Sequence, residues 1–80
     1  MILMILLSMS SEEKLKNDVL SAINSAEMRL ATVQRDSGEK DVVENLLKIA
    51  KSFVRGNAYE KALIYAKRAQ EVAWKLSMSS

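Results

Sequence analysis

The chain has 80 residues and a formal net charge of +2, with two glycines and no proline, cysteine or histidine. Its length allows one domain with one core. The lack of cysteine and histidine excludes disulfides and removes the commonest catalytic base and metal ligand. The acidic residues Asp36, Glu39 and Asp41 lack the spacing of a calcium loop. Because the composition favours helix over strand, we expect an all-α protein that is not an enzyme and has no cofactor, metal or small-molecule substrate.

Residues 1–9 include the apolar run MILMILL. The run is much shorter than the ~20 residues that a membrane-spanning helix needs, and it lacks the basic region and cleavage site of a signal peptide. Two interpretations remain open. Either the natural protein starts at Met9, after an upstream start codon, or residues 1–9 are an apolar extension that covers one end of the domain or joins two subunits. We expect a cytoplasmic protein without a transmembrane segment.

The first helix is expected over residues 11–35, because Ser10 and Glu13 have the spacing of a capping box. Apolar residues then recur at steps of three and four, which indicates a helix with one face against a core. A helix of this length measures about 38 Å. Its apolar stripe consists of Leu15, Val19, Ala22, Ile23, Ala26, Leu30 and Val33.

The second helix is expected over residues 42–54, about 20 Å long, because Asp41 and Glu44 again have capping-box spacing. Val42 and Ile49 make its apolar arc broader than that of the first helix. Such an arc is typical of a helix that lies between two neighbours. The inward-facing residues are Val43, Leu46, Leu47, Ala50, Phe53 and Val54.

A very short turn is expected at residues 55–59, which read RGNAY. Gly56 can adopt the left-handed conformation that ends a helix without steric strain. Asn57 is a good N-cap, and Glu60 follows at capping-box spacing. The helices on either side of so short a turn must lie antiparallel and in contact.

The third helix is expected over residues 58–77, with residues 78–80 as a frayed tail. Alanines along its inward-facing seam allow close approach of a neighbouring backbone, and Ile64 points away from that seam. Since the connections between helices are short, the sequence predicts an antiparallel up-down-up three-helix bundle over residues 10–77. The seam consists of Tyr59, Ala62, Ala66, Ala69, Ala73 and Leu76.

The hairpin at residues 46–69 carries Gly56 at its turn, then Tyr59, Ala62 and Ala69. In this it resembles one tetratricopeptide repeat, although its glycine-to-tyrosine spacing is one residue longer, the closing proline is absent and the unit occurs once. It also resembles the first two helices of microtubule-interacting-and-trafficking domains, in which the third helix follows the hairpin rather than precedes it. Either resemblance implies a peptide- or protein-binding scaffold without catalysis.

Self-association is expected because the first helix is longer than the second and the N-terminal run is apolar. Part of the first helix would then lack a partner within the chain. We expect an interaction module that forms a homodimer or binds a helical peptide. The expected interface residues are Ile2, Leu3, Ile5, Leu6, Leu7, Leu15, Val19 and Ile64.

An alternative function is the binding of nucleic acid or another polyanion through residues 48–75, which carry seven basic and two acidic side chains. The same basic residues are also typical of a solvated helix face, and no helix-turn-helix spacing accompanies them. The expected contact residues are Lys48, Lys51, Arg55, Lys67, Arg68 and Lys75.

Overall fold

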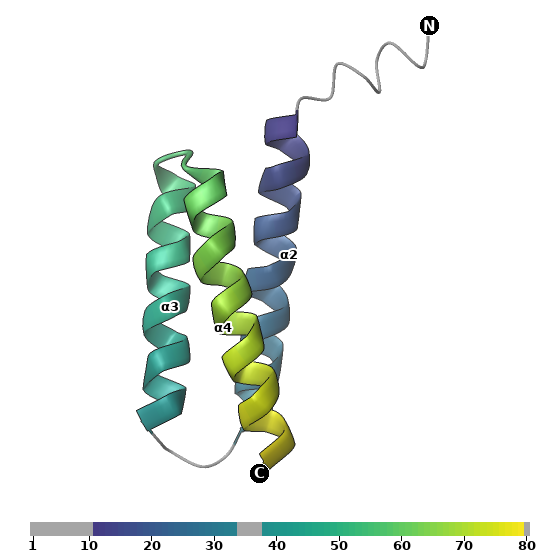
Figure 1. Ribbon diagram of the computed structural model, residues 1–80, viewed down its shortest axis with the longest axis vertical. Helices are drawn as coiled ribbons and strands as arrows, with labels where there is room; N and C mark the ends of the chain where they lie inside the picture. The colour runs from purple at the N-terminus through teal and green to yellow at the C-terminus, as the bar shows by residue number, and fades with distance from the viewer. Residues whose placement is uncertain (1–10, 34–37, 80) are drawn as a thin grey trace, which may run out of the picture.

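The computed structural model describes residues 11–33 and 38–79, and it confirms an all-α three-helix bundle. The helices are α2 (Ser11–Thr32), α3 (Gly38–Arg55) and α4 (Tyr59–Ser79). Figure 1 shows that α3 runs antiparallel to α2 and that α4 returns in the direction of α2. The expected N-terminal extension lies outside the described residues.

The central helix of the bundle is α4, which packs against both α2 and α3, whereas α2 and α3 share few contacts (Figure 1). The prediction that the second helix lies between the other two is therefore wrong. Four fully buried alanines of α4 let two helices approach it from two sides. The broad apolar arc of α3 is only partly covered, and Val42 remains 48% and Ile49 39% exposed. The four alanines are Ala62, Ala66, Ala69 and Ala73.

The core consists mostly of small side chains. Among the buried residues, Val19 and Val43 are the largest side chains that are completely enclosed. Larger residues such as Phe53 and Tyr65 pack against this core from its edges. The buried core cluster is Val19, Ala22, Ile23, Ala26, Val43, Leu47, Ala50, Tyr59, Ala62, Ala66, Ala69 and Ala73.

The helix boundaries differ from the prediction in ways that affect the expected interface. Helix α3 begins at Gly38 rather than at residue 42. Asp41 therefore lies inside the first turn with Glu39, where a carboxylate interacts favourably with the helix dipole, and it is not the N-cap. With 22 and 18 residues, α2 and α3 are about 33 and 27 Å long. The expected excess length of the first helix is largely absent.

The other two boundaries also shift. Helix α2 ends at Thr32, and the backbone nitrogen of Val33 donates to the Leu30 carbonyl at 3.1 Å as the helix closes. The end expected at residue 35 lies outside the described residues. Helix α4 continues to Ser79, so Met78 belongs to the helix rather than to a frayed tail.

The turn between α3 and α4 is short, as predicted, but Asn57 and not Gly56 takes the left-handed conformation. Asn57 has φ 62°, and no described glycine has a positive φ. The nitrogen of Ala58 donates to the Phe53 carbonyl at 2.8 Å, and that of Asn57 to the Val54 carbonyl at 3.0 Å. These two bonds form a Schellman motif. Asn57 therefore closes α3 instead of capping α4, and its side-chain oxygen accepts a 2.9 Å hydrogen bond from the Tyr59 hydroxyl.

Candidate interaction surface on α4

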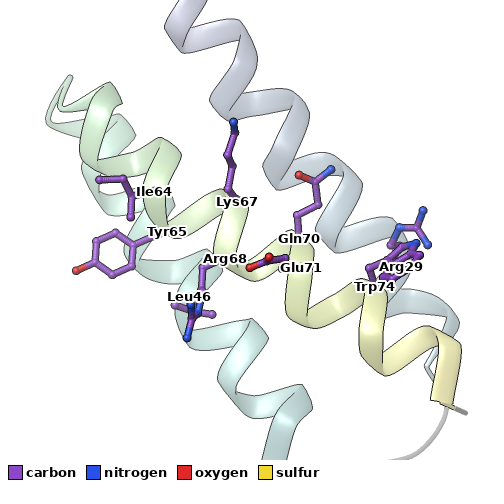
Figure 2. A pocket seen from close by; sticks show the side chains of 9 residues that line it. All are labelled: Arg29, Leu46, Ile64, Tyr65, Lys67, Arg68, Gln70, Glu71 and Trp74. Atoms are coloured by element: carbon purple, nitrogen blue, oxygen red, sulfur yellow. The ribbon is translucent and has the colours of Figure 1, made fainter.

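A broad groove of about 1040 Å³ runs over the side of α4 that faces away from the core. Figure 2 shows that α4 supplies most of its lining, with one residue each from α2 and α3. The buried alanines of α4 face the core, so the residues on the opposite side of the helix face solvent and form the groove. Its lining residues are Arg29, Leu46, Ile64, Tyr65, Lys67, Arg68, Gln70, Glu71 and Trp74.

Two large apolar side chains lie towards opposite ends of this groove. Ile64 is 67% and Trp74 47% exposed, and Figure 2 shows them separated along α4 by polar residues. Between them, Lys67, Arg68 and Glu71 are exposed. No ion pair engages these three side chains within residues 11–33 and 38–79. The groove thus combines exposed apolar groups with charges that have no partner in the described chain.

Contacts on both sides of the groove hold its lining in place. The Tyr65 ring stacks on the Phe53 ring of α3, with centroids 5.5 Å apart and planes inclined by 22°. On the other side, the Gln70 amide donates to the Ser25 hydroxyl of α2 at 3.2 Å. Because both neighbouring helices anchor α4, a partner would meet a preformed surface.

The interface residues predicted from the sequence lie at different depths. Ile64 lies in the groove, but Val19 is completely buried in the core and is not available to a partner. Leu15 is half-buried and lines a separate groove of about 400 Å³ beside Tyr59, at the N-terminal end of α2. Residues 2, 3 and 5–7 lie outside the described part of the chain.

The six basic residues predicted to contact a polyanion line different grooves. Lys67 and Arg68 lie in the α4 groove. Lys48 and Lys51 line another groove, which also contains two acidic residues of α2 and α3. The Lys51 ammonium lies 2.8 Å from the carboxylate of one of them, Glu27. Arg55 lines a third groove beside Lys51, and Lys75 lines none of these grooves.

Sequence reasoning missed most of the groove. It did not use Arg29, Leu46, Tyr65, Glu71 or Trp74 as site residues. A usable signal was present, because the steps from residue 64 to 67, 71, 74 and 78 alternate between three and four. That spacing places the residues on one stripe of a helix.

Neither a metal site nor a membrane span is found in the described part of the chain. Within residues 11–33 and 38–79, no three His, Cys, Asp or Glu side chains are placed to hold a metal ion. None of the three helices is sufficiently long and apolar to cross a membrane. Comparison with protein-family models, with curated proteins and with solved structures gives no match.

Proposed function

We propose that this chain is a non-enzymatic helical protein-interaction module that self-associates through the α4 groove. The observation that carries the proposal is the exposure of Ile64 and Trp74 in one groove of a small domain. Tryptophan, tyrosine and arginine are the residue types that contribute most at interface hot spots. The groove offers Trp74, Tyr65 and two arginines.

The small core gives a second reason for association. A domain of this size buries only about 60% of the surface that its unfolded chain exposes. The innermost layer of this core is built mainly from alanine and valine, whose burial contributes less than that of larger apolar side chains. Association that covers Ile64 and Trp74 would add apolar burial and stabilise the folded state by mass action.

The mass of the protein in solution tests this proposal. Light scattering over a range of concentrations is expected to give twice the 9.0 kDa mass of the chain. The double variant Ile64→Ala/Trp74→Ala is expected to give the single-chain mass. Val42→Ala is the control, since Val42 is also 48% exposed but lies outside this groove. A wild-type protein that stays at 9.0 kDa throughout would refute self-association.

The N-terminal end of α2 is a competing contact site for the same function. The groove beside Leu15 and Tyr59 lies at the end of the bundle where α2 begins. Deletion of residues 1–8 distinguishes the two sites. A dimer that survives the deletion and is lost in Ile64→Ala/Trp74→Ala forms through α4. A dimer with the opposite behaviour forms through the N-terminal end.

A further inference from the structure

The exposed side of α4 carries a seam with coiled-coil spacing that the three-helix bundle does not use. Its residues recur at alternating steps of four and three, the mean period of 3.5 at which one helix meets another in a coiled coil. All six side chains are exposed. We call this seam the outer stripe, and it consists of Glu60, Ile64, Lys67, Glu71, Trp74 and Met78.

The four central residues of the outer stripe are complementary to themselves when the stripe is reversed. Ile64 and Trp74 lie equally far on either side of Ala69 along the chain, and so do Lys67 and Glu71. In two antiparallel copies of α4, related by a two-fold axis beside Ala69, each residue meets its counterpart across that midpoint. Ile64 then faces Trp74 of the second copy, and Lys67 faces Glu71 of the second copy.

Resting on the function proposed above, we propose that two copies of this chain pair through antiparallel outer stripes. The pairing joins the large apolar side chains and also brings opposite charges together. A parallel pairing would place Lys67 against Lys67 and Glu71 against Glu71, and like charges at such short distance are unfavourable. The charge order therefore selects the antiparallel arrangement.

The surroundings of the stripe fit a second helix. Arg68 follows Lys67 and adds a second positive charge opposite Glu71 of the other copy. Leu46 of α3 and Arg29 of α2 border the groove (Figure 2). A helix that fills the groove would therefore contact all three helices of the bundle. Lys67, Arg68 and Glu71 have no ion-pair partner within the described chain. Pairing through the outer stripe therefore breaks no salt bridge among the described residues.

A charge-swap experiment tests this arrangement. Lys67→Glu/Arg68→Glu makes the charged centre of the stripe acidic throughout, and Glu71→Lys makes it basic throughout. Each variant alone is expected to lose self-association at least ~10-fold, because like charges then meet across the two-fold axis. An equimolar mixture is expected to form a heterodimer, since every charged pair is again opposite in sign. Lys48→Glu, an exposed substitution on α3, is the control and leaves the wild-type dimer intact.

Sedimentation velocity gives the masses, and circular dichroism verifies that each variant is helical. Fluorescence of Trp74, the only tryptophan, supplies a second readout because its emission shifts to shorter wavelength on burial. Monomeric variants that also fail to associate when mixed would refute the antiparallel pairing. Variants that remain dimeric alone would place the dimer on another surface, and self-association itself would still stand. A wild-type monomer would refute both proposals.

Discussion

At the scale of single residues, the alanines of α4 determine how the bundle packs. Ala66 and Ala69 are completely buried, as their place in the predicted seam requires. An alanine between two neighbouring helices leaves no room for a longer side chain, because protein interiors are packed at the density of organic crystals. The same residues therefore permit close packing and restrict which substitutions the core accepts.

The substitution Ala66→Leu is expected to destabilise the bundle by ~1–3 kcal/mol through overpacking. For a domain of this size, each 1 kcal/mol lowers the Tm by roughly 4–8 °C. Thermal unfolding followed by circular dichroism measures the effect. Ala31→Leu is the matched control, because it makes the same change at an exposed position of α2. An unchanged Tm in Ala66→Leu would contradict the packing of α4 described here.

At the scale of the elements, the sequence predicted the number and direction of the helices but not their neighbours. Periodicity identifies which face of a helix is apolar, and short connections require antiparallel order. Neither reveals which helix lies in the centre. The broad apolar arc of α3 indicated that α3 is the central helix. In the structure α4 is central, because its small residues allow α2 and α3 to approach it. Part of the α4 groove was missed for a related reason, since Arg29 and Leu46 join it only through tertiary packing.

In the turn between α3 and α4, Asn57 rather than Gly56 has a positive φ. We therefore expect substitution of Asn57 to be the more destabilising. Asn57→Ala is expected to reduce the free energy of unfolding by ~1 kcal/mol, because alanine at φ 62° is strained and the hydrogen bond from Tyr59 is lost. Asn57→Gly loses the same hydrogen bond but is not strained at this φ, so it is expected to destabilise the protein less. Chemical denaturation measures both.

Gly56→Ala is the companion variant. A Cβ at Gly56 would lie 3.7 Å from the Phe53 carbonyl oxygen, an ordinary van der Waals distance, and the φ of Gly56 is not positive. The substitution is expected to stabilise the protein by ~0.4–1 kcal/mol, since alanine has fewer conformations to lose on folding. Strong destabilisation by Gly56→Ala, together with tolerance of Asn57→Ala, would indicate that Gly56 and not Asn57 has the left-handed conformation.

At the scale of the whole molecule, the excess of basic residues in the C-terminal half does not form one uniform surface. Lys48 and Lys51 lie beside acidic residues, and Lys67 and Arg68 lie beside Glu71. Exposed ion pairs such as Lys51 with Glu27 contribute only about 0–1 kcal/mol to stability. Their main effect here is to reduce the positive charge that a polyanion would meet.

Binding to nucleic acid is accordingly expected to be weak. Fluorescence anisotropy with labelled DNA and RNA is expected to show no sub-micromolar affinity at ~0.15 M salt, with binding that declines further as salt rises. Sub-micromolar binding that is lost on replacing Lys48, Lys51 and Arg55 would instead support the polyanion alternative. Loss of binding on replacing Lys67 and Arg68 would instead place the polyanion site in the α4 groove rather than on α3.

The central position of α4 has a consequence for the order of events on the ribosome. Helices α2 and α3 are synthesised first, yet they share few contacts with each other. At ~5–20 residues per second, the 21 residues of α4 require ~1–4 s. During that interval the apolar stripes of α2 and α3 lack their main partner and are open to chaperones. We therefore expect a nascent chain released before α4 is complete to lack the helix against which α2 and α3 both pack.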